Sequence, residues 1–238
     1  MAKYSVLLPT YNESENLPIV VPLLFEVAET HGFDLEVVVV DDNSPDGTAK
    51  IAQQLKEVYP GKITLHSRPG KLGLGSAYID GLRYCSGDFV FLMDADLSHH
   101  PKYLPEYIQK QQQTGADIVT GTRYRPGGGV GGWNLFRKLT SRVANFIANT
   151  LMDPKCSDLT GSFRLYKKDV LSFIMPRIQS RGYVFQMEAI VRAREECFHI
   201  EEVPIVFIDR LFGESKLGGN EILAYLKGLF ALAGSARF

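Results

Sequence analysis

Two aspartates, Asp94 and Asp96, stand one residue apart directly after the apolar run 89–93. In an extended backbone, residues i and i+2 point to the same side, so both carboxylates would face one spot. Two such charges stay ionised together only beside a cation, or else one carboxylate takes up a proton. The doublet therefore predicts a metal site, and its hard oxygen ligands favour Mg²⁺ or Mn²⁺ over zinc.

Similar polar clusters follow three other apolar runs, with the sequences PTYNE at 9–13, DDNSPDG at 41–47 and GTRY at 121–124. Ligands of open α/β sheets bind at the carboxyl ends of the strands, so we expect these clusters to line one crevice. Acidic groups there suit a ribose, a base and a divalent metal, which together indicate a nucleoside diphosphate ligand. A local turn with a helix N-cap at Asp46 explains the second cluster equally well, and this alternative stays open.

The elements that must position these clusters alternate along the chain. Apolar runs predict strands at 4–9, 35–40, 62–67, 88–93, 117–122 and 203–209. Amphipathic segments predict helices at 14–30, 46–59, 73–86 and 101–114. The continuous β-branched run 37–40 is typical of a strand buried on both faces. The sequence therefore predicts an α/β fold with a mostly parallel central sheet and helices on both faces, and a mobile glycine-rich loop at 124–133.

Bulk composition excludes several classes of protein. The 238 residues suffice for one large domain, and the net charge of -1 argues against a globally basic nucleic-acid binder. Three cysteines without C-x-x-C spacing, Cys85, Cys156 and Cys197, argue against a disulfide framework or a zinc site and fit a reducing compartment. We expect no secretory signal and no membrane-spanning helix, because Glu26 and Lys227 interrupt the longest apolar stretches.

Eight motifs, in this order, resemble those of the dolichyl-phosphate mannose synthase family. They are PTYNE, VVDDNSPDGT, KLGLGSAYIDG, MDADLSHHP, GTRY, SDLTGSFRLY, GYVFQMEAIVRA and DRLFGESKLGG. The resemblance covers nearly the whole chain and implies a single Rossmann-like domain of the GT-A type over residues 1–238. Residues 1–123 would form the nucleotide-sugar-binding half, and residues 124–238 an acceptor-binding half with amphipathic helices and a lid loop.

The resemblance also implies an activity. The enzyme would transfer mannose from GDP-mannose to dolichyl phosphate by an inverting, metal-dependent direct displacement. The product, dolichyl β-D-mannosyl phosphate, would serve N-glycosylation, O-mannosylation and GPI-anchor synthesis. Two alternatives stay open: a polyprenyl-phosphate glucosyltransferase that uses another sugar nucleotide, and a non-catalytic subunit that only binds a sugar nucleotide.

Site residues follow from the same motifs. By resemblance, the donor is bound by Pro9, Tyr11, Glu13, Val40, Asp42, Asp94, Ala95, Asp96, Arg123, Arg210 and Lys216. Asp96 would ligate the metal directly, Asp94 would position donor and metal, and Ser98 stands where some family members have a glutamine ligand. For Tyr11 and Glu13 the alternative is a helix start that favours acidic side chains. A metal bound through His99 or His100 is a further alternative, although a His-His-Pro run more commonly faces solvent or caps a helix.

The acceptor needs positive charge more than it needs a base. A phosphate monoester has a second pKa of about 6 and is largely dianionic at neutral pH, so it can attack the sugar directly. The resemblance places its phosphate at Arg123, Arg137 and Ser141, the last two being four residues apart on one helix face. The alternative for Arg137 is a solvated basic face shared with Lys138 and Arg142. Arg210 and Lys216 would ride on a glycine-rich lid, for which a plain surface turn is the alternative.

Two apolar stripes at helical spacing suggest how the chain reaches a lipid. The first comprises Phe136, Leu139, Val143, Phe146 and Ile147, and the second Ile222, Leu226, Leu229, Phe230 and Ala233. Core packing explains either stripe equally well. The resemblance implies that small hydrophobic membrane subunits bind the C-terminal helix and that the first stripe touches lipid. The predicted location is therefore peripheral, on the cytosolic face of the endoplasmic reticulum membrane, with no nucleic-acid partner.

Overall fold

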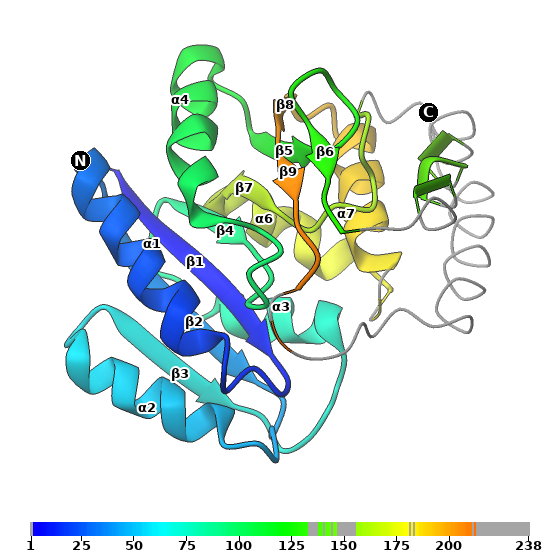
Figure 1. Cartoon of the computed structure of the whole chain (residues 1–238). Helices are drawn as coiled ribbons and strands as arrows, with labels where there is room; N and C mark the ends of the chain where they lie inside the picture. The colour runs from blue at the N-terminus through cyan, green and yellow to red at the C-terminus, as the bar shows by residue number, and fades with distance from the viewer. Residues whose placement is uncertain are drawn as a thin grey trace.

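A computed structural model gives the structure of the chain (Figure 1). It describes residues 2–132, 138–139, 141–143, 145–146, 156–180, 182, 184–210 and 212. Arg137, Lys216, the second apolar stripe and the lid beyond residue 212 lie outside the described residues. The predictions that concern them therefore stay predictions.

A seven-stranded sheet forms the centre, in the order β3-β2-β1-β4-β7-β5-β8. Its strands are β1 Lys3–Thr10, β2 Asp34–Asp41, β3 Ile63–Ser67, β4 Phe89–Leu92, β5 Ile118–Thr122, β7 Arg164–Lys167 and β8 Ile200–Pro204. Neighbouring strands are parallel except at β7, which runs antiparallel to both β4 and β5. The predicted mostly parallel sheet is confirmed.

Helices cover both faces of this sheet, as predicted (Figure 1). They are α1 Leu17–His31, α2 Thr48–Val58, α3 Leu74–Leu82, η1 Pro101–Tyr103, α4 Leu104–Thr114, α6 Lys168–Ile174, η2 Met175–Arg177 and α7 Val184–Glu195. Two buried clusters show the layering: one contains side chains of α3, α6 and α7, and the other contains side chains of α1, α2 and α4. Along β1, Leu7 belongs to the first cluster and Val6 and Leu8 to the second, as the alternation of a strand requires. Full burial of each such side chain contributes about 1.5–3 kcal/mol.

Two glycines end helices that feed the sheet. Gly32 after α1 and Gly115 after α4 have φ angles of 68° and 69°, a left-handed conformation that is strained for residues with a Cβ. The Gly32 amide donates to Glu29, the Phe33 amide to Ala28, and the Gly115 amide to Gln111, so last-turn carbonyls are satisfied. Both turns lead directly into strands, β2 and β5, whose carboxyl ends form part of the site.

Three sequence predictions are corrected by the fold. The predicted strand 203–209 is two strands, because β8 ends at Pro204 and β9 Val206–Phe207 joins a separate sheet with β6 Gly129–Val130. The described part of the predicted loop 124–133 therefore contains a strand. Strand β7 was not predicted, because Arg164 interrupts its apolar pattern. Arg164 is nevertheless fully buried and donates to the backbone carbonyls of Leu159 and Gln186.

The described part of the chain bears on the membrane prediction as well. In these residues, no helix is both long enough and apolar enough to cross a bilayer.

The three cysteines are free thiols, of which Cys85 and Cys156 are buried and Cys197 is exposed. Burial raises the pKa of Cys85 to about 12, which keeps that thiol protonated and unreactive.

Candidate active site

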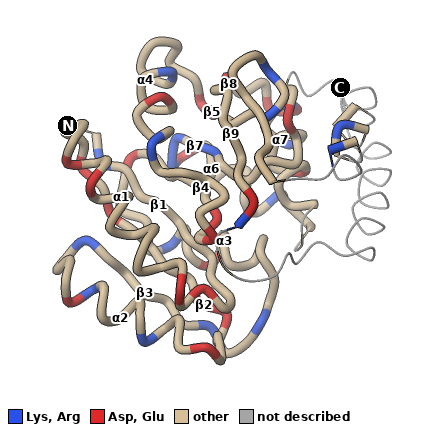
Figure 2. Tube along the Cα trace, in the orientation of Figure 1, with Lys and Arg blue, Asp and Glu red and all other residues tan. Residues whose placement is uncertain are grey.

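The antiparallel strand β7 determines which segments meet at the site edge. Parallel strands bring the carboxyl ends of β1, β2, β4 and β5 to one edge of the sheet, and the reversed β7 brings its amino end to the same edge. Acidic and basic stretches of the trace accordingly meet there (Figure 2). The segment 156–163, which leads into β7, therefore contributes side chains to this edge that strand-end reasoning does not predict.

The carboxylate doublet lies in a tight turn beyond β4. The strand ends at Leu92 and the chain bends at Ala95, so the extended-backbone argument does not describe the doublet itself. Asp96 Oδ1 accepts hydrogen bonds from the amide (3.1 Å) and the hydroxyl (2.5 Å) of Ser98. Leu97 between them has a φ angle of 65°, a conformation that costs a non-glycine residue energy and is common at functional sites. The turn thus fixes the orientation of the Asp96 carboxylate.

Asp94 is held from two sides. Its Oδ2 atom accepts a hydrogen bond from the Ser162 hydroxyl at 2.8 Å, and His99 Nδ1 lies 3.7 Å from the same oxygen. Desolvation raises the pKa of Asp94, although its side chain is still 32% exposed, and the negative charge of Asp96 adds to this rise. The doublet therefore has the electrostatic strain that the sequence predicts for two neighbouring carboxylates.

The two histidines behave differently. His99 is 2% exposed, and its Nδ1 accepts the Asp94 amide hydrogen at 3.2 Å, so the ring is neutral at that nitrogen. Desolvation lowers the pKa of His99, which keeps the imidazole uncharged. The expectation that it faces solvent is wrong, because its ring packs between Phe163 and Phe207. His100 does cap a helix: its Nδ1 accepts the Lys102 amide hydrogen at the start of η1.

Arg210 pairs directly with the doublet. Its Nη2 atom lies 3.2 Å from Asp96 Oδ2, and the two side chains are only 20% and 10% exposed. The backbone is tied to the same turn, because the Ile208 amide donates to the Ser98 carbonyl at 3.3 Å. Arg210, predicted to contact the donor phosphates, is thus placed beside a predicted metal ligand. The prediction about the phosphates is untested by this contact.

The donor atoms at the doublet fit a hard divalent cation. In the portion of the chain that the structure describes, no three His, Cys, Asp or Glu side chains form a group that could hold a metal ion. Asp94 and Asp96 supply carboxylates, however, and Ser98 a hydroxyl. Proteins commonly hold Mg²⁺ through one or two carboxylates and let substrate phosphates and water complete the shell. The residues present fit Mg²⁺ or Mn²⁺ bound together with a diphosphate.

The predicted base and ribose site surrounds the ends of β1 and β2. Asp42 is 7% exposed and accepts hydrogen bonds from Arg68 Nη1 at 2.7 Å and from the Leu72 amide at 3.2 Å. Desolvation raises the pKa of Asp42, and the charge of Arg68 opposes that rise. The Lys71 ammonium lies 4.5 Å from the centre of the Tyr11 ring. Arg68 and Lys71 are therefore members of this site that the sequence analysis missed, and they come from the segment before α3.

Other members of these motifs have structural contacts. The Glu13 carboxylate accepts from the Asn16 side-chain amide at 2.6 Å just before α1, but the first turn of α1 has no acidic residue, so this contact does not bear out the helix-start alternative. Asp46 accepts the Thr48 amide hydrogen at 3.0 Å, so the local-turn alternative holds for this residue, although the N-cap of α2 is Gly47 and not Asp46. Val40 is fully buried and pairs with Pro9 between β1 and β2, which leaves only its backbone to reach a ligand. None of these contacts excludes the predicted donor roles.

Arg123 follows β5 and is held by a fully buried carboxylate. Asp158 accepts from its Nε and Nη2 atoms, both at 2.6 Å, and from its backbone amide at 3.1 Å. Thr160 accepts a further hydrogen bond from Nη2, and the guanidinium carbon lies 5.6 Å from the centre of the Phe207 ring. This bidentate pairing fixes the plane of the guanidinium. Asp158, from the segment before β7, is a third residue of the candidate site, after Arg68 and Lys71, that the sequence did not predict.

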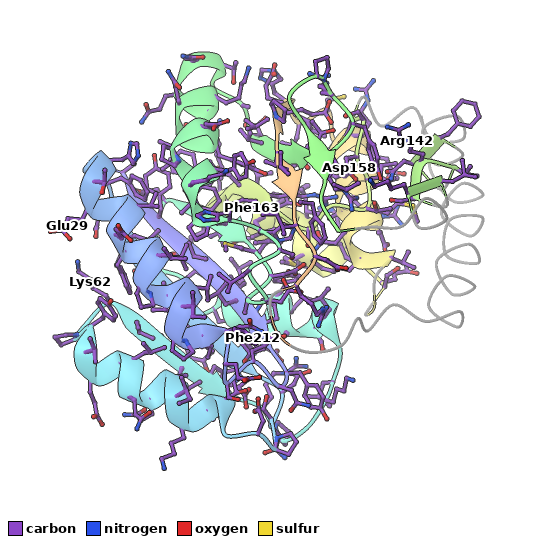
Figure 3. All side chains as sticks on the ribbon, in the orientation of Figure 1. Glu29, Lys62, Arg142, Asp158, Phe163 and Phe212 are labelled. Atoms are coloured by element: carbon purple, nitrogen blue, oxygen red, sulfur yellow. The ribbon has the colours of Figure 1, made fainter. Side chains whose placement is uncertain are left out.

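A small cavity opens beside Arg123. Its volume is about 80 Å³, and it is lined by Arg123, Tyr124, Gly128, Gly129, Val130, Lys138 and Arg142. Arg142 and Asp158 lie at the same end of the molecule in Figure 3. Ser141 adjoins this region, because its hydroxyl hydrogen-bonds the Tyr124 hydroxyl at 2.6 Å. Two cations of the alternative basic face, Lys138 and Arg142, therefore line the same cavity as Arg123.

The doublet and the cavity are neighbours. His99 contacts Asp94, its ring lies 5.4 Å from Phe207, and Phe207 contacts Arg123. A single aromatic pair thus separates an acidic pair suited to a metal-bound diphosphate from a cationic cavity suited to a second phosphate. An α/β sheet with this arrangement at its carboxyl edge is typical of a glycosyltransferase.

Comparisons with known proteins agree with this class. The model of the family "Glycosyl transferase family 2" matches residues 5–174, so the chain belongs to glycosyltransferase family 2. It is 38% identical over 221 residues to a polyprenol monophosphomannose synthase of Mycolicibacterium smegmatis, covering 91% of this chain and 82% of that protein. It is 37% identical over 234 residues to a dolichol-phosphate mannosyltransferase of Pyrococcus furiosus, covering 97% of this chain but only 63% of that longer protein. These relatives confirm the resemblance read from the motifs.

A solved structure supports the fold. A mannosyltransferase of Pyrobaculum calidifontis, solved in complex with GDP-Man and Mn²⁺, aligns with a TM-score of 0.68 and 21% sequence identity. The alignment covers all of this chain and 65% of that one. The predicted GT-A fold is thereby confirmed.

Proposed function

We propose that this glycosyltransferase transfers mannose from GDP-mannose to dolichyl phosphate or a related polyprenyl phosphate, with inversion at the sugar. One observation carries the proposal: the carboxylate doublet and the cationic cavity lie side by side, joined through His99 and Phe207. The names of the two relatives, a polyprenol monophosphomannose synthase and a dolichol-phosphate mannosyltransferase, support the same donor sugar and acceptor class.

The donor binds along the ends of β1, β2 and β4. Tyr11 offers a face for the base, Asp42 accepts from base or ribose, and Lys71 and Arg68 stabilise these two side chains. Asp94 and Asp96, with Ser98, hold Mg²⁺ or Mn²⁺, which when bound stabilises the negative charge that develops on the leaving diphosphate. The Mn²⁺ in the complex of the Pyrobaculum mannosyltransferase supports a divalent ion of this kind. Arg210 and Lys216 add positive charge to the same phosphates.

The acceptor phosphate binds at the cationic cavity. Because the phosphate monoester is already largely dianionic at neutral pH, no side chain needs to remove a proton from it. Asp158 holds Arg123 in one orientation, and Lys138 and Arg142, which line the same cavity, add charge. Ser141 and Arg137 complete the predicted acceptor set. In this proposal, most donor contacts come from residues 1–123, and residues 124–238 bind the acceptor, while Arg210 and Lys216 reach back to the donor phosphates and Arg123 serves both ligands.

Contact with a membrane follows from a lipid acceptor. Leu139, Val143 and Phe146 of the first apolar stripe are 62%, 46% and 72% exposed, which favours lipid contact over core packing. Lys138 and Arg142 beside them suit anionic headgroups. Docking of the C-terminal helix on small hydrophobic membrane subunits, at the cytosolic face of the endoplasmic reticulum, remains a prediction. Expressed alone, the chain should wash off membranes with carbonate, and resistance to carbonate would contradict this peripheral attachment.

The test of the proposed function is transfer of labelled mannose from GDP-mannose to a short dolichyl phosphate. We expect product with either Mg²⁺ or Mn²⁺ and almost none with a chelator, because the doublet loses the cation that supports the leaving group. UDP-glucose is offered in parallel, and transfer of glucose from it in place of mannose would favour the glucosyltransferase alternative. Absence of transfer from every donor would favour the non-catalytic subunit.

Removal of the charges of Lys138 and Arg142, which line the cavity, should weaken acceptor binding. In the double variant Lys138→Gln/Arg142→Gln, we expect the KM for dolichyl phosphate to rise about tenfold, because two charge-assisted contacts to phosphate are lost. The KM for GDP-mannose should stay within about twofold, because the donor binds elsewhere. The control is Lys56→Gln, an exposed charge on α2 that does not line the cavity. An unchanged acceptor KM would exclude Lys138 and Arg142 from the acceptor site.

A further inference from the structure

Arg210 occupies an oxygen of Asp96 that the proposed metal would need. Both carboxylate oxygens of Asp96 have protein partners: Ser98 donates twice to Oδ1, and Arg210 lies 3.2 Å from Oδ2. A divalent cation that ligates Oδ2 and a guanidinium at the same oxygen would repel each other. One of the two must therefore give way.

The geometry shows how the exchange can occur without moving the turn. The Ile208 amide is bonded to the Ser98 carbonyl, so the backbone two residues before Arg210 stays beside the metal loop. The Arg210 side chain is 20% exposed and long enough to turn from Asp96 toward a phosphate bound nearby. Ser98 holds Asp96 Oδ1 in either case, so the carboxylate keeps its orientation while its partner changes.

We propose that Arg210 is an internal counter-ion that occupies Asp96 in the donor-free enzyme and lowers its affinity for a free divalent cation until a nucleoside diphosphate binds. The diphosphate supplies both a new partner for the guanidinium and the missing metal ligands. Metal and nucleotide then bind with positive coupling, part of which comes from the release of Arg210. This inference rests on the proposed metal site and adds that binding of the nucleotide favours binding of the metal there.

The described acidic groups support this coupling. Because no three His, Cys, Asp or Glu side chains of the described residues form a group that could hold a metal ion, the protein alone is a weak metal site. Thermodynamic linkage then requires that the nucleotide strengthens metal binding by the same factor by which the metal strengthens nucleotide binding. This factor has two sources, the metal ligands that the diphosphate supplies and the release of Arg210. Removal of Arg210 should therefore reduce it.

The experiment measures Mn²⁺ binding to the intact chain by the electron paramagnetic resonance signal of free Mn²⁺, without nucleotide and with saturating GDP. In Arg210→Gln, we expect the Kd for Mn²⁺ alone to fall about threefold to tenfold below wild type, because a competing ion pair is removed. The strengthening of Mn²⁺ binding by GDP should shrink in the same variant. Mannose transfer should nevertheless decrease, because Arg210 also contacts the donor phosphates in the proposed function.

Two variants separate the counter-ion from general electrostatics. Arg210→Lys keeps the charge, so its Mn²⁺ affinity should stay within about twofold of wild type. Lys102→Gln removes an exposed charge that follows the metal loop but does not touch Asp96, and it should also leave the Kd nearly unchanged. Melting temperatures check that all variants are folded. Tighter Mn²⁺ binding with weaker catalysis is a result that simple damage to the site would not produce.

Two results would overturn the inference in distinguishable ways. If Arg210→Gln binds Mn²⁺ alone as weakly as wild type or more weakly, Arg210 is no counter-ion, although the proposed metal site stands. If wild-type protein binds no Mn²⁺ even with GDP, the proposed metal site itself is wrong and the counter-ion role falls with it.

Discussion

Replacement of Asp96 by alanine should lower mannose transfer by about a thousandfold or more while the protein stays folded. Asp96 is the carboxylate that the Ser98 turn orients, and its Oδ2 atom faces the charge of Arg210. Its loss removes charge from the site and no apolar bulk from the core, and it relieves the repulsion on Asp94. The measurement is the initial rate of transfer with Mn²⁺, together with a thermal melt.

Two further variants serve as comparisons for Asp96→Ala. Asp88→Ala removes a carboxylate from the other end of β4, where it accepts the Lys3 amide hydrogen, and should leave turnover within about twofold. Ser98→Ala removes the hydroxyl that holds Asp96 and should cost about tenfold, because the amide still supports the carboxylate. If Asp96→Ala kept a tenth of the wild-type rate, the carboxylate doublet would not be the metal site.

Replacement of Asp158 by alanine should be the most destabilising single change near the site. The carboxylate is fully buried and satisfies three hydrogen-bond donors of Arg123, which is itself only 8% exposed. Removing one partner of a buried ion pair leaves an uncompensated charge and typically costs about 3–5 kcal/mol. For a chain of this size, the melting temperature should fall by about 10 °C. Thermal denaturation followed by circular dichroism measures the shift.

A double variant tests the cause of this loss. Arg123→Met/Asp158→Leu removes both charges, so it should recover much of the stability that Asp158→Ala loses, but it should not recover mannose transfer. If the double variant melts as low as Asp158→Ala, lost packing and not the unpaired charge explains the effect. Thr160→Val removes the hydrogen bond to the guanidinium together with those to Asn145 and Asp158, keeps the ion pair, and should cost about 1–3 kcal/mol.

The same pair predicts how stability depends on pH. Burial tends to raise the pKa of Asp158, but the charge and hydrogen bonds of Arg123 outweigh it and lower the pKa below its usual value. A carboxylate with a lowered folded pKa contributes its full stability above the unfolded pKa of about 3.9 and loses it as pH falls through the folded value. The difference in melting temperature between wild type and Asp158→Ala should therefore be constant from pH 7 to about pH 4 and shrink below that.

The sequence predicts the parallel half of the fold well because its strands are continuous apolar runs. The segments 4–9 and 35–40 fall within β1 and β2, whose buried faces leave little ambiguity. Strand β7 escapes this reasoning, because a buried arginine satisfied by backbone carbonyls looks like a surface residue in the sequence. The break between β8 and β9 escapes it too, because the apolar run 203–208 joins the last two residues of β8 to β9 without interruption.

The candidate site, too, is predicted from the sequence only in part. The sequence places Asp94 and Asp96 side by side, although a turn and not an extended strand carries them, and the convergence of strand ends follows from a parallel sheet. The pairing of Asp158 with Arg123 joins residues 35 positions apart and depends on the reversed direction of β7, which no local pattern reveals. The pairing of Arg210 with Asp96 likewise depends on where β9 meets the metal loop.

The position of β7 also has a consequence for how this protein can be divided. In the proposed division, residue 123 separates a donor-binding half from an acceptor-binding half, yet β7, from residues 164–167, lies between β4 and β5 of the first half. A fragment cut at residue 123 would lose the strand that joins β5 to the rest of its sheet, together with the carboxylate that neutralises Arg123. The two proposed halves therefore belong to one folding unit. An exchange of donor halves between relatives should require that β7 is moved together with its neighbouring strands β4 and β5.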